Sequence, residues 1–163
     1  MTSSFVKFTG PLDYRYDRDA SRVLGEDHWR VLRGFRYYIG EPGSNEWVDV
    51  ECGELSDRAS VPRLLHSLVP PDGVHGQAAV LHDKLCRTLT IIKNGEPVRI
   101  TRARADAIFL EAMEALETPW LRRRLAYTAV AAYRLVSFTS EPQENPLRAR
   151  LEREWREHNQ SPC

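Results

Sequence analysis

Hydrophobic and polar residues alternate in the first third of the chain, a pattern typical of half-buried strands. Apolar or aromatic side chains recur at every second position in 35–39 and 47–52, and 29–32 is a similar short segment. Residues 40–45 carry the Gly, Pro, Ser and Asn side chains of a turn. We therefore expect short strands at the three segments, with a hairpin joining the last two, in an antiparallel sheet.

After residue 75 the apolar positions take helical spacing. Thr101 is a suitable N-cap, and Thr118-Pro119 combines a cap residue with proline at the first helical position. Asn94-Gly95, between the first two helical segments, is a strong hairpin signal. We expect three helices, over 75–88, 101–117 and 118–138.

The end of the chain predicts one more helix. A polar linker, 139–144, is followed by Asn145-Pro146, again a cap residue and a proline. The apolar face of this helix consists of Leu147, Leu151 and Trp155. Because that stripe is narrow, we expect the helix to be appended to the domain rather than to belong to its core.

Together these elements predict an α+β fold. A small N-terminal antiparallel sheet is followed by a helical bundle with an inserted hairpin and an appended C-terminal helix. The 163 residues fit one domain of ordinary size. We place the α+β domain at 1–138, and the linker with the appended helix at 139–163.

Composition narrows the function classes. Lys plus Arg equals Asp plus Glu, 23 against 23, so we expect no nucleic-acid partner. Three cysteines without CxxC spacing predict neither a disulfide framework nor a zinc knuckle and suit a reducing cytoplasm. Residues 1–10 lack a signal-peptide pattern, and the longest apolar stretch, 125–138, is too short for a transmembrane segment and contains Arg134. We expect a protein made in the cytoplasm.

The most concentrated chemistry surrounds His82. Residues three and four positions from it are Ala or Leu, apart from Cys86, so His82 lies on an inward helix face. Asp106 occupies the apolar side of the next helix. Helices joined by a tight hairpin pack antiparallel, which would bring Asp106 to the imidazole. An Asp bonded to one ring nitrogen fixes the tautomer and leaves the other as a general base. The alternative is a structural bond between two helices.

Two further carboxylates are candidate metal ligands. Asp83, next to His82, and Asp57 in the preceding loop could supply oxygens to a hard cation such as calcium. The alternative for Asp57 is local turn capping. A Ser60–His82–Asp106 triad is a third arrangement, although no elbow motif surrounds Ser60.

Four segments carry a family resemblance, namely 57–63 (DRASVPR), 70–73 (PPDG), 78–83 (AAVLHD) and 104–113 (RADAIFLEAM). In this order and spacing the chain, over roughly Phe5 to Phe138, resembles the family called domain of unknown function 1353, which is common in tailed-phage genomes. The resemblance implies a phage or prophage origin and brings no established activity. The family usually has an aromatic residue where Cys86 stands.

A second resemblance is to phospholipase A2 enzymes. These have a His-Asp pair on a helix, a hairpin, and a second helix whose Asp bonds that His. In them the His activates water, and the adjacent Asp binds calcium beside a Gly-rich loop. This chain lacks that loop and the disulfide frame. The same order is followed here by His82, Asp83, Asn94-Gly95 and Asp106.

Two function hypotheses follow. In the first, the protein is a hydrolase of an ester in lipid or cell envelope, with His82 as base, Asp106 orienting it, and Asp83 with Asp57 on a calcium ion. In the second, it is a non-catalytic virion component of a tail or baseplate, whose partners are other phage virion proteins and whose His-Asp pair is structural. The protein would be made in the host cytoplasm and, in the second case, incorporated in the virion. The sequence leaves both open.

Overall fold

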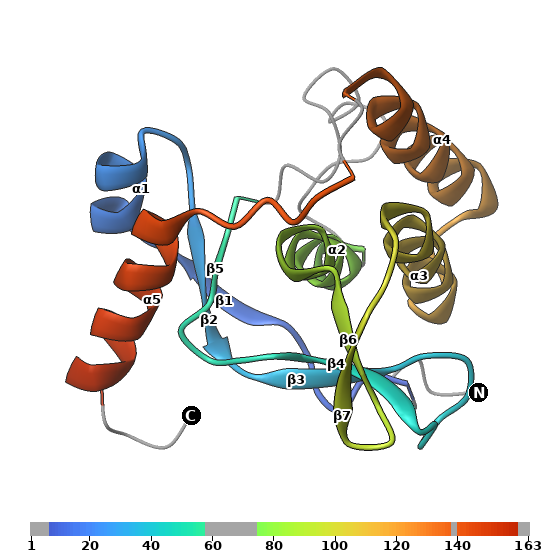
Figure 1. Cartoon of the computed structure of the whole chain (residues 1–163), viewed down its shortest axis with the longest axis horizontal. Helices are drawn as coiled ribbons and strands as arrows, with labels where there is room; N and C mark the ends of the chain where they lie inside the picture. Colours follow the sequence, from blue (N-terminus) through green and yellow to red (C-terminus); the bar gives the residue numbers. More distant parts are fainter. Residues whose placement is uncertain (1–6, 58–74, 138–139, 160–163) are drawn as a thin grey trace.

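The computed structural model describes residues 7–57, 75–137 and 140–159, and these form two antiparallel sheets with helices packed beside them (Figure 1). One sheet has the order β1-β2-β5, from β1 (Asp13–Tyr16), β2 (Trp29–Arg33) and β5 (Leu55–Ser56). The other has the order β3-β4-β6-β7, from β3 (Phe35–Tyr38), β4 (Glu46–Val50), β6 (Thr90–Lys93) and β7 (Glu96–Arg99). The α+β class predicted from the sequence is confirmed.

Both predicted hairpins are present. Strands β3 and β4 pair with Phe35 opposite Val50. Strands β6 and β7 meet at Asn94-Gly95, where both residues have positive φ angles, 52° and 84°, as a tight hairpin turn requires. Strand β6 also pairs with β4, so the second hairpin extends the N-terminal sheet. This pairing joins distant segments, and local sequence patterns do not reveal it.

Four helices lie within a few residues of their predicted positions, namely α2 (Gly76–Thr88), α3 (Arg102–Ala115), α4 (Trp120–Ser137) and α5 (Pro146–His158). Thr101 caps α3 by accepting a hydrogen bond from the Arg104 N–H at 3.1 Å. Asn145 caps α5 by accepting from the Leu147 N–H at 3.0 Å. Both caps were predicted from residue type alone.

The short helix α1 (Arg18–Leu24) was not predicted. Its signals are local: Asp17 accepts from the Ala20 N–H at 2.9 Å, and Gly25 ends the helix with a φ of 78°. Seven residues are too few to display a repeated apolar stripe, so hydrophobic periodicity does not predict this helix.

The hydrophobic core lies between the inner face of the β3-β4-β6-β7 sheet and helices α2 and α3, with a small contribution from α4. Helix α2 is central: it lies between α3 on one side and α5 on the other (Figure 1), and nearly all of its residues are buried. Two polar residues of this helix, His82 and Asp83, consequently need protein partners.

Helix α5 packs on the domain through polar side chains. Its buried residues are Arg148 and Glu152, whereas Leu147, Leu151 and Trp155 are half-buried. Its described residues contribute nothing to the hydrophobic core cluster. The sequence correctly predicted the helix, but its apolar stripe did not identify the residues that dock it.

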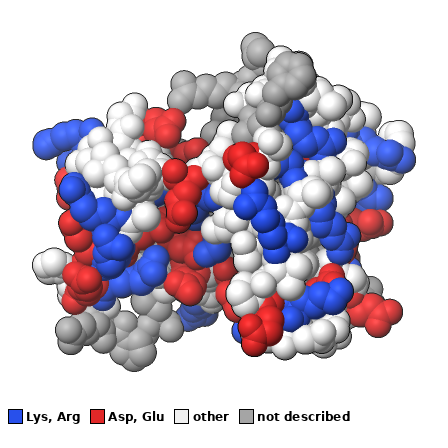
Figure 2. Space-filling view, viewed as in Figure 1, with Lys and Arg blue, Asp and Glu red and all other residues white. Residues whose placement is uncertain are grey.

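The cysteines and the surface charges add two facts. Cys86 is free and buried, whereas Cys52 is disulfide-bonded, and the sequence patterns did not predict a disulfide. On the face shown in Figure 2, basic and acidic side chains are interspersed, in keeping with the balanced charge of the chain. None of the described helices is long and apolar enough to cross a membrane.

Candidate active site

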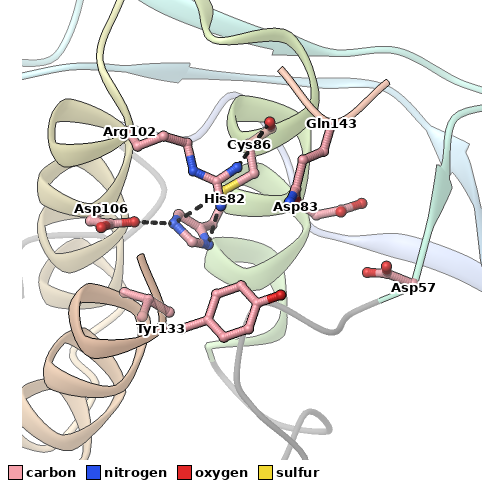
Figure 3. Close-up of a pocket in the computed structure, with 9 residues that line it drawn as sticks. Asp57, His82, Asp83, Cys86, Arg102, Asp106, Tyr133 and Gln143 are labelled. Atoms are coloured by element: carbon pink, nitrogen blue, oxygen red, sulfur yellow. Dashed lines mark hydrogen bonds and ion pairs between the residues drawn. The ribbon is translucent and has the colours of Figure 1, made fainter. Parts of the chain in front are cut away.

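Helices α2 and α3 bring His82 and Asp106 together. Nε2 of His82 lies 2.8 Å from Oδ1 of Asp106, and both side chains are almost completely buried (Figure 3). A carboxylate can only accept, so Nε2 carries the proton of this bond. The contact predicted from the two helix faces is therefore confirmed, while its chemical role remains a prediction.

A third helix completes the arrangement. Nη1 of Arg134, on α4, lies 2.8 Å from Oδ2 of Asp106. Both oxygens of Asp106 thus have partners, as a buried carboxylate requires. In the sequence, Arg134 is marked only as a charge within an apolar stretch. The chain His82–Asp106–Arg134 connects α2, α3 and α4.

The imidazole of His82 is held between two side chains. The ring of Phe109 stacks on it with centroids 4.6 Å apart. The Sγ atom of Cys86, one turn along α2, lies 3.5 Å from Nε2 and 3.8 Å from Nδ1. Burial lowers the pKa of His82, but the electrostatic interaction with Cys86 and the hydrogen bonds to Asp106 and Cys86 outweigh burial and raise the pKa to about 9.

His82 forms part of the wall of a cavity of about 180 Å³. Because Nε2 is bonded to Asp106, the neutral ring has its lone pair on Nδ1. Among the described residues, Nδ1 has one hydrogen-bond partner, the Cys86 sulfur at 3.8 Å. The cavity is lined by Asp57, His82, Asp83, Cys86, Arg102, Asp106, Val130, Tyr133 and Gln143 (Figure 3).

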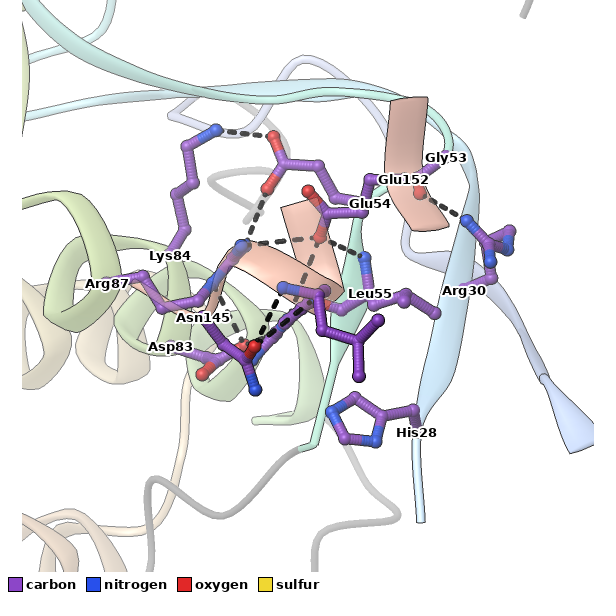
Figure 4. A network of polar contacts seen from close by, with 12 residues as sticks. His28, Arg30, Gly53, Glu54, Leu55, Asp83, Lys84, Arg87, Asn145 and Glu152 are labelled. Atoms are coloured by element: carbon purple, nitrogen blue, oxygen red, sulfur yellow. Dashed lines mark hydrogen bonds and ion pairs between the residues drawn. The ribbon is translucent and has the colours of Figure 1, made fainter. Parts of the chain in front are cut away.

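Asp83 lines the same cavity but is bonded to α5. Its Oδ2 atom lies 2.6 Å from Nη2 of Arg148 and 3.8 Å from Nε of Arg87. Figure 4 shows Asp83 and Arg87 side by side on α2. Burial raises the pKa of Asp83, but the charges of Arg148 and Arg87 outweigh burial, and the pKa lies below its ordinary value. Two guanidinium groups therefore compete with any cation for this carboxylate.

The calcium site at Asp83 and Asp57 stays a prediction. Asp57 also lines the cavity, on the side away from Asp106 in Figure 3. No group of three or more His, Cys, Asp or Glu side chains is arranged for a metal within 7–57, 75–137 and 140–159. Ser60, of the alternative triad, lies outside these ranges.

The sequence patterns do not identify three polar residues of the cavity wall: Arg102, Tyr133 and Gln143. Gln143 belongs to the predicted linker, and its backbone N–H donates to the Cys86 carbonyl at 3.2 Å. Arg102 is the first residue of α3. Neither position has a local signal, because each reaches the cavity through tertiary packing.

Comparison with known proteins places the chain in a family without assigning an activity. A family model described as "Protein of unknown function (DUF1353)" matches residues 29–130, well over half of the chain. No curated protein and no solved structure matches it. The match includes His82, Asp83 and Asp106, whereas Arg134 and α5 lie beyond it. The family resemblance found in the sequence is thereby confirmed, and the chain belongs to this family of proteins of unknown function.

Proposed function

We propose that this protein is a hydrolase that cleaves an ester, with His82 as the general base and Asp106 as the residue that positions it. The observation that carries the proposal is the 2.8 Å bond between Nε2 and Asp106 in the wall of a cavity. An oriented imidazole with a lone pair beside a space for substrate is the minimum arrangement for activating water. An ester of lipid or cell envelope is the substrate we favour from the resemblances in the sequence.

The proposed reaction uses water and the two ring nitrogens. Nδ1 of His82 takes a proton from a water molecule, and the resulting hydroxide bonds to the ester carbonyl carbon. The tetrahedral intermediate then collapses, the bond to the alcohol oxygen breaks, and His82 returns the proton to that oxygen. Asp106 stabilises the imidazolium that exists between the two transfers.

The raised pKa of His82 determines the pH at which this base works. With a pKa of about 9, most of the imidazole is protonated at neutral pH and cannot accept a proton. We therefore expect hydrolysis to increase tenfold per pH unit below the pKa and to level off near pH 9.

A panel of p-nitrophenyl esters of increasing acyl length tests the proposal. His82→Gln should abolish hydrolysis above the uncatalysed rate, and Asp106→Asn should lower kcat by roughly 10²- to 10⁴-fold. His158→Gln is the matched control, because His158 is exposed on α5, and its activity should equal that of the wild type. Equal activity of His82→Gln and the wild type would contradict the proposal, provided that both have the same far-UV CD spectrum.

A second candidate function is a structural virion component. It is favoured by large apolar side chains that are more than half exposed on α4, including Trp120, Leu121, Leu135 and Val136. Such side chains are used in protein contacts. Finding the chain in purified phage particles, together with no hydrolysis of any ester in the panel, would favour this function over the hydrolase.

A further inference from the structure

The cavity contains a buried positive charge that has no counter-ion within 7–57, 75–137 and 140–159. The side chain of Arg102 lines the cavity, and the residue is 7% exposed. Its Nη1 donates to the Cys86 carbonyl at 3.2 Å, and its Nε is buried without a hydrogen-bond partner. Among the described residues it forms no ion pair, although burying an unpaired charge is costly.

Other buried arginines differ from Arg102 in this respect. Arg87 and Arg148 also have an Nε atom without a hydrogen bond. However, the Nε of Arg87 lies 3.8 Å from Asp83, and that of Arg148 lies 3.7 Å from Glu152. Their charges are compensated by described acidic side chains, and no such side chain in the described part of the chain compensates Arg102.

The carboxylates that line the cavity do not supply the missing counter-ion. Asp106 is bonded to His82 and Arg134, and Asp83 is bonded to Arg148. Figure 3 shows Arg102 extending over His82, with Asp57 on the opposite side of the cavity. Arg102 and His82 thus line the same cavity, and a ligand bound there would lie beside both.

We infer that the cavity binds an oxyanion, a carboxylate or phosphate group, through Arg102. A guanidinium group presents several N–H donors in one plane, which suits the paired oxygens of such groups. A cavity of about 180 Å³ holds a group of this size, with the rest of a larger molecule outside. As a statement about the substrate, this inference rests on the proposed function: the ester would carry an acidic group near the bond that is cleaved.

The melting temperature of the full chain tests this inference. Sodium phosphate and sodium acetate are each compared with sodium chloride at equal ionic strength and pH. When the anion concentration is about ten times its Kd, binding should raise the melting temperature of the wild type by roughly 3–6 °C. The phosphate and acetate arms distinguish the two kinds of oxyanion.

Two variants locate the effect. Arg102→Met should lose the rise and, in chloride, should melt at or above the wild-type temperature, because an uncompensated buried charge is removed. Arg99→Met is the matched control, because the Arg99 side chain is 62% exposed and pairs with Glu141; it should keep the rise. No rise in the wild type, or an equal rise in Arg102→Met, would overturn the inference.

A measurement on the wild type covers the case in which Arg102→Met fails to fold. The NMR signal of the Arg102 Nε–H should shift on adding phosphate or acetate, and an unchanged signal for both would overturn the inference. These measurements involve no ester. Anion binding without hydrolysis would thus contradict the proposed function alone, and hydrolysis without anion binding would contradict this inference alone.

Discussion

His82 and Asp83 are neighbours on α2, yet they belong to two polar regions with different properties. His82 faces α3 and α4, where Asp106 is bonded to Nε2 and to Arg134, and Nδ1 has only the Cys86 sulfur as a partner among the described residues. Asp83 faces β5 and α5, where its carboxylate is bonded to arginine. The comparison shows that one buried helix can carry a candidate reactive group on one side and a structural contact on the other.

The second region is the α5 network, which we define as Glu54, Asp83, Lys84, Arg87, Arg148 and Glu152 (Figure 4). It contains three acidic and three basic side chains, so its charges balance. It also supplies partners to the edge strand β5: the Leu55 N–H donates to Glu152 at 2.8 Å, and Arg148 donates to the Leu55 carbonyl. These contacts bind α5 to the domain without an apolar core.

Breaking the α5 network should have the largest effect on stability. Arg148→Met removes the closest partner of a buried carboxylate, Asp83, and should lower the free energy of unfolding by about 3–5 kcal/mol. Arg150→Met is the control on the same helix, because the Arg150 side chain is 57% exposed and pairs with the exposed Glu154. It should cost at most about 0.5 kcal/mol. Urea unfolding of both variants measures the difference, and equal effects would mean that α5 is not docked through Arg148.

A smaller loss is expected at Gly53, where α5 approaches the chain closely. Gly53 has a φ of 87°, and a Cβ there would lie 2.8 Å from the Trp155 ring. Gly53→Ala should therefore cost about 2–4 kcal/mol, from backbone strain and displacement of Trp155. Gly40→Ala, with a φ of 82° and nothing nearby, should show the strain alone, about 1–2 kcal/mol. If the two variants were equally stable, Trp155 would not pack on Gly53.

The contributions of the two regions to stability should be lost at opposite ends of the pH scale. The pKa of His82 is raised, so its contribution to stability is present below its ordinary value of 6.5 and is lost as pH rises through about 9. The pKa of Asp83 is lowered, so its contribution is present above its ordinary value of 3.8 and is lost as pH falls below that value.

Chemical unfolding between pH 3 and pH 10 separates these contributions. His82→Gln should flatten the loss of stability on the alkaline side and leave the acid side unchanged. Asp83→Asn should do the reverse. A variant that changes both sides equally would show that the two regions are coupled and do not act independently.

Calcium should have the smallest effect. Arg148 and Arg87 already neutralise Asp83, and a cation would have to displace them. We expect millimolar calcium to leave the melting temperature unchanged. A rise that Asp83→Asn abolishes would show instead that Asp83 exchanges its arginine partner for a metal.

Local signals in the sequence were sufficient for much of the fold. Asn94-Gly95, Thr101 and Asn145 determine a turn and two helix starts through their own backbone preferences, and the structure agrees at all three. The pairing of β6 with β4 and the seven residues of α1 have no comparable signal. The first depends on segments more than 40 residues apart, and the second is too short for periodicity.

The candidate site likewise has residues that local sequence features predict and residues that they do not. The His82–Asp106 contact followed from two helix faces and a connecting hairpin, which are local features. Arg134 and Arg102 reach these residues through tertiary packing, which a single sequence does not reveal. In α5 the apolar spacing predicted that Leu147, Leu151 and Trp155 dock the helix, whereas its buried residues are Arg148 and Glu152. Amphipathic patterns do not identify charged residues that are buried in pairs.

The protonation state of His82 tests most directly whether this residue can act as the general base. NMR of ¹⁵N-labelled imidazoles, assigned with His82→Gln, reports both the tautomer and the pKa. We expect a neutral form with the proton on Nε2, an apparent pKa near 9, and a lower pKa in Cys86→Ala. A proton on Nδ1, or titration at the ordinary value of 6.5 in the wild type, would contradict the assignment of His82 as the base.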